Sequence, residues 1–192
     1  MARHTQRGKD VPKPKNAGQL LIRGKSGTAG KVRPGTRPQT VKRDEKRLRG
    51  LVRDYASADV MRHITIVRQG IPANAVTVLA GGLGLSKEQL ATALDISVPT
   101  LNRRARQEIA LSTPDSERVA GVMQLVGMVE RWATELGDGA PDGFAPTAWL
   151  GEWLSTANPA LGGAAPLTLL DTAEGRTLVT QVLGSLESGT FW

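Results

Sequence analysis

Charge and apolar side chains are divided unequally along the 192-residue chain. Residues 1–53 contain 16 Lys and Arg against three Asp and Glu, whereas residues 54–192 contain nine basic side chains against 15 acidic ones. Few large apolar residues occur before Leu48, and prolines and glycines interrupt the basic segment. Such a segment cannot bury enough apolar surface to offset the entropy lost on ordering. We therefore expect a disordered basic tail over residues 1–53 and a folded body after it.

The residue types that the chain lacks exclude several classes of protein. It has no cysteine, which excludes disulfides, thiolate metal sites and cysteine nucleophiles. With only His4 and His63, a histidine metal site or a Ser-His-Asp triad is not expected. The segment Gly24–Val32 resembles a phosphate loop, but its first glycine stands one residue too early and Val32 replaces the required hydroxyl. We expect no catalytic residue, no metal and no cofactor, and so no enzyme.

Membrane and export signals are also missing from the sequence. No stretch approaches the ~20 apolar residues of a membrane span. The N-terminus lacks the apolar core of a secretion signal. We expect a cytoplasmic protein with no membrane contact.

The folded body has the apolar spacing of an all-α protein. The first helix is expected before Gly70, with one apolar face formed by Val60, Met61, Ile64 and Val67. A strand over residues 63–67 is an alternative because β-branched residues are frequent there. His63 beside this face is more typical of a partly buried core residue than of a metal ligand. A short helix is expected from Pro72 to Leu79.

Residues 86–106 predict two helices joined by a sharp turn. Ser86 and Gln89 have the spacing of a capping box, which marks the start of the first helix. Asp95 stands where the turn requires a residue that tolerates positive φ. Ser97 is placed to cap the second helix. This order of signals is typical of a helix-turn-helix.

The second helix of this pair carries a dense polar and cationic surface. Arg can bond guanine in a bidentate manner, Asn can bond adenine, and Thr can bond phosphate or contact a thymine methyl. We interpret the helix as one that reads operator DNA, and the alternative is a solvated helix in an ordinary bundle. The candidate DNA-binding residues are Thr100, Asn102, Arg103, Arg104 and Arg106.

The C-terminal part is expected to contain a long helix, a compact turn-rich stretch and a last helix. Thr113 begins the long helix, which ends at Gly137, and Thr172 is placed to cap the last one. Between them lie Trp149-Leu150, Asn158-Pro159-Ala160-Leu161-Gly162-Gly163, Pro166-Leu167, Leu169-Leu170-Asp171-Thr172 and Gly175.

In order and spacing, these residues resemble the toxin-binding domain of the Xre/MbcA/ParS antitoxin family. The helix-turn-helix upstream resembles the Xre-like DNA-binding domain of the same family, so the resemblance spans roughly residues 55–192. It implies a DNA-binding domain over 54–112 and a helical toxin-binding domain over 113–192. It also implies an antitoxin of a type II toxin–antitoxin system. Such a protein blocks a RES-domain toxin that consumes NAD or uses it for ADP-ribosylation, forms a homodimer, and represses its own operon.

The resemblance further implies a toxin-binding surface in the C-terminal domain. For Trp149, an alternative is a place in the core, and the Asn158–Gly163 loop can be a structural turn without a partner. Aromatic residues at a chain terminus have the character of interface anchors. The implied residues are Trp149, Asn158, Pro159, Leu161, Gly162, Gly163, Gly189, Phe191 and Trp192.

Two questions stay open at the level of sequence. A transcriptional regulator whose C-terminal domain serves only dimerisation is the alternative to an antitoxin. The family resemblance does not explain the basic tail, which can add non-specific DNA affinity or act as a degradation handle when toxin is absent.

Overall fold

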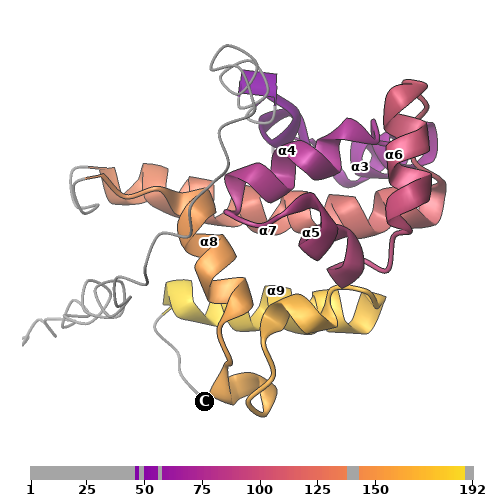
Figure 1. Cartoon of the computed structure of the whole chain (residues 1–192). Coiled ribbons are helices and arrows are strands. Elements are labelled where there is room, and N and C mark those ends of the chain that lie inside the picture. The colour runs from indigo at the N-terminus through magenta and orange to yellow at the C-terminus, as the bar shows by residue number, and fades with distance from the viewer. Residues whose placement is uncertain (1–45, 48–49, 56–57, 138–142, 189–192) are drawn as a thin grey trace, which may run out of the picture.

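The computed structural model describes residues 46–47, 50–55, 58–137 and 143–188. Over these ranges the chain is helical, as the all-α prediction requires, apart from turns and an isolated bridge between Pro72 and Ala110 (Figure 1). The α-helices are α3 (Val60–Gln69), α4 (Asn74–Gly82), α5 (Lys87–Ala93), α6 (Val98–Arg106), α7 (Thr113–Leu136), α8 (Pro146–Ser155) and α9 (Ala173–Ser188). Two short 3₁₀ helices, η2 (Pro159–Leu161) and η3 (Pro166–Leu169), lie between α8 and α9.

The long helix α7 forms the centre of the molecule. Ser112 caps its first turn, where the backbone N–H of Asp115 donates to the Ser112 hydroxyl over 3.3 Å. Apolar residues along the helix, including Val119, Val122 and Val126, are fully buried. Helices α3, α8 and α9 pack against α7, and Figure 1 shows α9 running below it. One helix therefore serves the core of both the N-terminal and the C-terminal parts.

The helix-turn-helix has the local geometry that the sequence predicts, except that Ser97, at the N-cap of α6, makes no capping hydrogen bond with its side chain. The Ser86 backbone N–H donates to Gln89 Oε1 over 2.8 Å, and the Gln89 N–H donates to Ser86 Oγ over 3.0 Å, which completes the capping box. Asp95 has φ of 50° in the turn between α5 and α6. Leu101 on α6 is buried and holds that helix against the core. The two helices of the motif contact each other, and α5 also packs on α4.

Helix α8 joins the C-terminal part to the helix-turn-helix part by a close backbone contact. A Cβ placed at Gly151 would lie 1.8 Å from the carbonyl oxygen of Leu83, directly after α4. Only glycine permits this approach, since any larger residue would overlap the backbone. Helices α8 and α9 then pack against α7, and η3 between them packs against α5.

The N-terminal region differs from expectation in three places. Residues 50–55 are helical and Val52 is fully buried, so 50–53 belong to the folded body rather than to the tail. Their apolar residues lie one helical turn apart, which lets them reach the core. Residues 1–45 and 48–49 of the expected tail lie outside the described residues. Helix α4 begins at Asn74 because Pro72 instead pairs with Ala110.

The third difference concerns α3. The structure confirms a helix rather than a strand, but most of the expected inner face is exposed: Val60 is 72%, Met61 69% and Ile64 36% exposed. Of that face only Val67 packs against the core, together with Ile66 and beside the half-buried His63. His63 stacks on Tyr55 with ring centroids 4.1 Å apart, in agreement with a structural role. Among the described residues, no group of His, Asp and Glu could hold a metal ion, and no helix is long and apolar enough to cross a membrane.

Candidate functional surfaces

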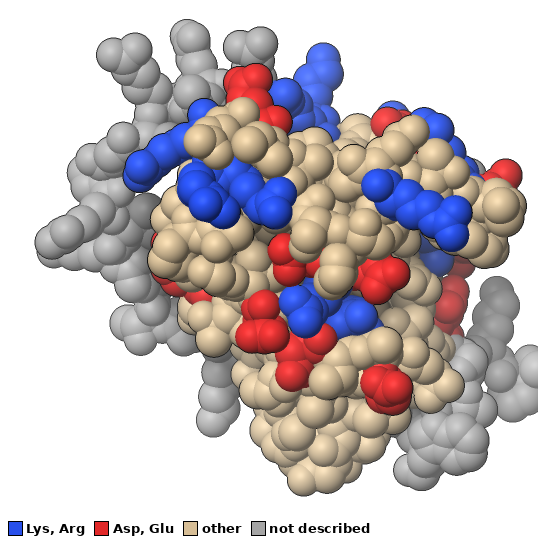
Figure 2. Space-filling model, turned by 90° about the vertical axis from the view of Figure 1, so that its right-hand side faces the viewer, with Lys and Arg blue, Asp and Glu red and all other residues tan. Residues whose placement is uncertain are grey.

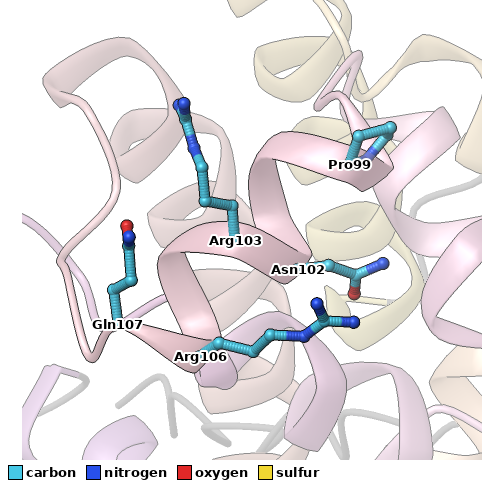
Figure 3. A pocket seen from close by; sticks show the side chains of 5 residues that line it. All are labelled: Pro99, Asn102, Arg103, Arg106 and Gln107. Atoms are coloured by element: carbon cyan, nitrogen blue, oxygen red, sulfur yellow. The ribbon is translucent and has the colours of Figure 1, made fainter.

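Helix α6 presents a polar, cationic face to solvent. Ser97 precedes its first residue and Pro99 lies in its first turn, where a missing N–H costs nothing. Arg103 and Arg106 are exposed, whereas Leu101 on the other side of the helix is buried. A shallow hollow on this face is lined by Pro99, Asn102, Arg103, Arg106 and Gln107 (Figure 3). Three of the predicted DNA-binding side chains therefore lie together on one accessible face.

Lys87 of α5 adds a further cation beside this face. Its Nζ donates to Asn102 Oδ1 over 2.7 Å and lies 3.4 Å from a carboxylate oxygen of Glu88. This bond uses the carbonyl oxygen of Asn102, so the NH₂ end is the donor that the side chain can offer to a base. Lys87 was missed in the sequence because its position, the first residue of a capped helix, is typical of solvated residues.

Arg104 and Thr100 lie apart from the hollow. Arg104 is half-buried, and its Nη1 donates to the carbonyl oxygen of Ala110 over 2.6 Å. This bond ties α6 to the segment that leads into α7. Thr100 is also half-buried. The guanidinium of Arg104 is thus engaged with the backbone, and neither Arg104 nor Thr100 lines the hollow.

The charges of this side of the molecule are unevenly placed. Figure 2 shows blue side chains gathering in the upper part of the view and red ones chiefly across its middle. Basic residues near acidic ones include Arg118, which contacts Asp95 and Asp115, and Arg176, whose pKa the nearby charges of Glu117 and Asp171 act to raise. Arg103 and Arg106, by contrast, are exposed on the α6 face. An unneutralised cationic face favours phosphate backbones.

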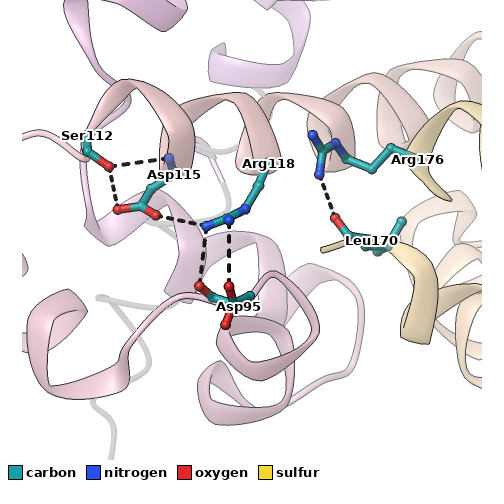
Figure 4. Close-up of polar contacts among 6 residues, drawn as sticks. All are labelled: Asp95, Ser112, Asp115, Arg118, Leu170 and Arg176. Atoms are coloured by element: carbon teal, nitrogen blue, oxygen red, sulfur yellow. Dashed lines mark hydrogen bonds and ion pairs between the residues drawn. The ribbon is translucent and has the colours of Figure 1, made fainter. Parts of the chain in front are cut away.

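A polar network fixes the turn before α6 to α7 (Figure 4). Arg118 of α7 donates to the carbonyl oxygen of Asp95 and to Asp115 Oδ1, each over 3.3 Å. The Ser112 hydroxyl donates to Asp115 Oδ2 over 2.6 Å, which orients that carboxylate. On the same side of α7, Arg176 donates to the carbonyl oxygen of Leu170 over 2.8 Å. Burial, and next the charge of Arg118, lower the pKa of the Arg176 guanidinium.

In the C-terminal part, residues 158–163 form a self-contained turn. The Asn158 side chain accepts from the N–H of Ala160 over 2.9 Å, and the Asn158 carbonyl accepts from Leu161 and Gly163 over 3.0 Å each. Gly162 and Gly163 have φ of 65° and 86°. A Cβ at either glycine would meet nothing within 4 Å, so both face open space. The turn is thus closed by its own hydrogen bonds, exposed at its two glycines and packed against the core through Leu161.

Comparison with known proteins identifies both parts. Residues 62–124 match the antitoxin Xre-like helix-turn-helix domain, and residues 136–189 match the antitoxin Xre/MbcA/ParS C-terminal toxin-binding domain. The chain is also 37% identical to the Prs ADP-ribosylating antitoxin of Sphingobium sp. (strain YBL2) over 137 residues, which are 71% of this chain and 84% of that protein. The chain belongs to the Xre/MbcA/ParS antitoxin family. As an antitoxin with a toxin-binding domain it is a binding protein and not an enzyme.

Within the toxin-binding domain of this antitoxin, the predicted toxin-contacting residues have different surroundings. Pro159, Gly162 and Gly163 are exposed, whereas Asn158 and Leu161 are half-buried. Trp149 is half-buried, packs against the core, and lies near Phe144 with ring centroids 6.4 Å apart. The remaining predicted residues, Gly189, Phe191 and Trp192, lie outside the described residues. The boundary between residues 112 and 113 stays a prediction, and α7 contacts helices on both sides of it.

Proposed function

We propose that this antitoxin neutralises a RES-domain toxin by occlusion and represses its own operon by placing α6 in the major groove of operator DNA. It acts in the cytoplasm as a homodimer within the toxin–antitoxin complex. The observation that carries this proposal is the exposed α6 face, which combines Asn102, Arg103 and Arg106, in a chain whose other domain is a toxin-binding domain.

The α6 face has the chemistry that base reading requires. Arg103 and Arg106 are exposed and have five N–H donors each, which suits the acceptor pair of guanine or a phosphate. The Nδ2 end of Asn102 is suited to an acceptor on a base edge. The turn at Asp95 is bonded to α7, so α6 is held at a defined angle as one rigid element. We also propose that the basic tail adds salt-dependent affinity for DNA, because counterion release scales with the phosphates neutralised.

The nature of the toxin is inferred from the relative. The name of that protein links it to ADP-ribosylation, a reaction that takes the ADP-ribosyl group from NAD. We therefore propose that the partner of this chain is a toxin that uses NAD. The exposed turn 158–163 is the candidate contact because it is preorganised and loses little entropy on binding. The terminal residues Gly189, Phe191 and Trp192 are proposed as a second contact.

The DNA-binding part is tested with the double variant Arg103→Ala with Arg106→Ala. Each lost base contact costs about 1–3 kcal/mol, so we expect operator affinity to fall at least about fivefold for each residue and at least about 30-fold for both. Arg131→Ala, which removes an exposed arginine of α7, is the matched control. Toxin neutralisation should be unchanged in both. Unchanged operator binding by the double variant would remove α6 from the proposal.

The toxin-binding part is tested separately by deletion of residues 189–192. We expect the truncated chain to bind operator DNA normally and to protect poorly against NAD loss when mixed with its toxin. A tagged full-length chain should also retain a toxin that a 1–139 fragment does not. Full protection by the truncated chain would refute the terminal contact, and recovery of DNA alone with both chains would favour a plain repressor.

A further inference from the structure

The side chain of Asn102 on the α6 face is held in one orientation by Lys87. From the first position of α5, Lys87 Nζ donates to Asn102 Oδ1 over 2.7 Å. An ammonium group has donors only, so the atom that it contacts must be the carbonyl oxygen of the carboxamide and not the nitrogen. Both residues are half-buried, which strengthens this bond relative to a fully solvated one. The Nδ2 group is therefore the part of Asn102 that remains for a ligand.

This orientation changes the base that Asn102 suits. A free asparagine pairs with adenine through both ends of its carboxamide, since Oδ1 accepts from the N6 amino group while Nδ2 donates to N7. Here Oδ1 already accepts from an ammonium group, whose positive charge would face the partly positive hydrogens of N6. Guanine has two acceptors, O6 and N7, at its major-groove edge. Guanine therefore satisfies the donors of Asn102 and Lys87 together, and adenine does not.

The groups around this pair favour the same base. Arg106 lines the same hollow as Asn102, and Figure 3 shows its guanidinium extending towards the Asn102 side chain. Gln107, which has the other carboxamide of the hollow, lies on the opposite side of that view. The Glu88 carboxylate is 3.4 Å from Lys87 Nζ, but its side chain is 61% exposed, so solvent weakens the ion pair. The Asn102 end of the hollow thus offers mainly donors and positive charge.

We propose that Lys87 is a specificity-determining residue of this antitoxin, which engages Asn102 Oδ1 and so makes the pair select guanine and reject adenine. The inference rests on the proposed reading of operator DNA by α6 and names the base that is read there. Thymine is a poorer match than guanine, because its one acceptor, O4, lies beside a methyl group. Loss of the ammonium group frees Oδ1 and restores the ordinary preference of asparagine for adenine.

Selection from random duplex DNA by the full-length chain tests this assignment. Asn102→Ala identifies the position that Asn102 reads, because base preference is relaxed there and kept elsewhere. At that position we expect the wild-type chain to select guanine and Lys87→Met to select adenine. The ratio of the two bases should change at least about fivefold. Lys87→Arg is the conservative variant, which can still donate to Oδ1 and should keep guanine.

Three results of the selection would overturn the proposal. One is adenine at the identified position with the wild-type chain. Another is an equal loss of affinity for all sequences in Lys87→Met, since Lys87 would then contact phosphate and not determine the base. The third is an Asn102→Ala variant with unchanged base preferences, which would mean that Asn102 reads no base.

Modified bases test the same contact without relying on the folding of the Lys87 variants. 7-Deazaguanine lacks the N7 acceptor, so at the identified position it should lower the affinity of the wild-type chain at least about fivefold. Inosine keeps both O6 and N7, so it is the matched control and should bind as guanine does. Equal affinity for 7-deazaguanine and guanine would overturn the proposal. Operator binding that survives Arg103→Ala with Arg106→Ala would instead refute the proposed role of α6, so the two failures are distinguishable.

Discussion

Arg118 on α7 holds Asp95 in the turn of the helix-turn-helix. Its Nη1 donates to the Asp95 carbonyl oxygen over 3.3 Å, and its Nη2 lies 3.6 Å from Asp95 Oδ2. Asp95 has φ of 50°, a conformation that costs most residues about 1–2 kcal/mol. The contact therefore supports the turn from the helix that also carries the toxin-binding domain. We therefore expect the angle of α6 to depend on α7 through this pair.

Replacing Arg118 with Gln tests this dependence. We expect the free energy of unfolding to fall by about 1 kcal/mol, because a hydrogen bond to a charged group is lost from a site only partly shielded from water. Operator affinity should fall as well, although the side chain is not on the α6 face. Urea unfolding and a DNA titration measure the two effects. Arg131→Gln on the same helix is the control, and equal values for the two variants would contradict the assigned role.

The local signals in the sequence predicted the helix-turn-helix well because they act over a few residues. The capping box of Ser86 and Gln89, the positive φ of Asp95 and the N-cap at Thr172 all depend on neighbours in the chain. Each of these local signals favours a single backbone conformation. The same holds for the paired glycines after Leu161, whose positive φ values close the turn.

Features that depend on distant packing could not be predicted in this way. Periodicity identified α3 as a helix, but it could not show which side faces α7, since apolar residues occur on both. Arg104 and Arg106 look equivalent in the sequence, yet only Arg104 reaches the carbonyl of Ala110. Lys87 became part of the α6 face because the turn brings α5 beside α6. These relations are set by tertiary contacts, which local spacing does not encode.

Gly151 is expected to be intolerant of a side chain. Its Cβ would lie 1.8 Å from the Leu83 carbonyl oxygen, and both groups are backbone, so Gly151→Ala must push α8 away from α4. We expect a loss of about 1–3 kcal/mol in the free energy of unfolding, the range of overpacked cores. Gly81→Ala is the control, because that helical glycine has nothing within 4 Å. Urea unfolding should show the control to be more stable by about 0.5–1 kcal/mol.

Tyr55 gives the folded chain a dependence on alkaline pH. Burial raises the pKa of its phenol above the ordinary value of 10.0, so the folded state holds the proton more tightly than the unfolded state. At pH values below the ordinary pKa, Tyr55 makes its full contribution to the free energy of unfolding. This contribution is lost as the pH rises through the raised pKa of the folded state. Tyr55→Phe should remove this part of the loss. Urea midpoints of both chains between about pH 8 and about pH 11 measure it, and parallel curves would contradict the prediction.

The turn at residues 158–163 offers a test that separates backbone shape from side-chain contact. Gly162 has φ of 65° and open space around it, so an alanine there meets no neighbour but occupies a conformation that costs about 1–2 kcal/mol. Asparagine visits this conformation more readily, because its side chain can bond locally. We therefore expect Gly162→Ala to weaken toxin binding more than Gly162→Asn, although asparagine is larger. Calorimetric titration with the toxin measures both. The reverse order would mean that the added volume, and not the shape of the turn, limits binding.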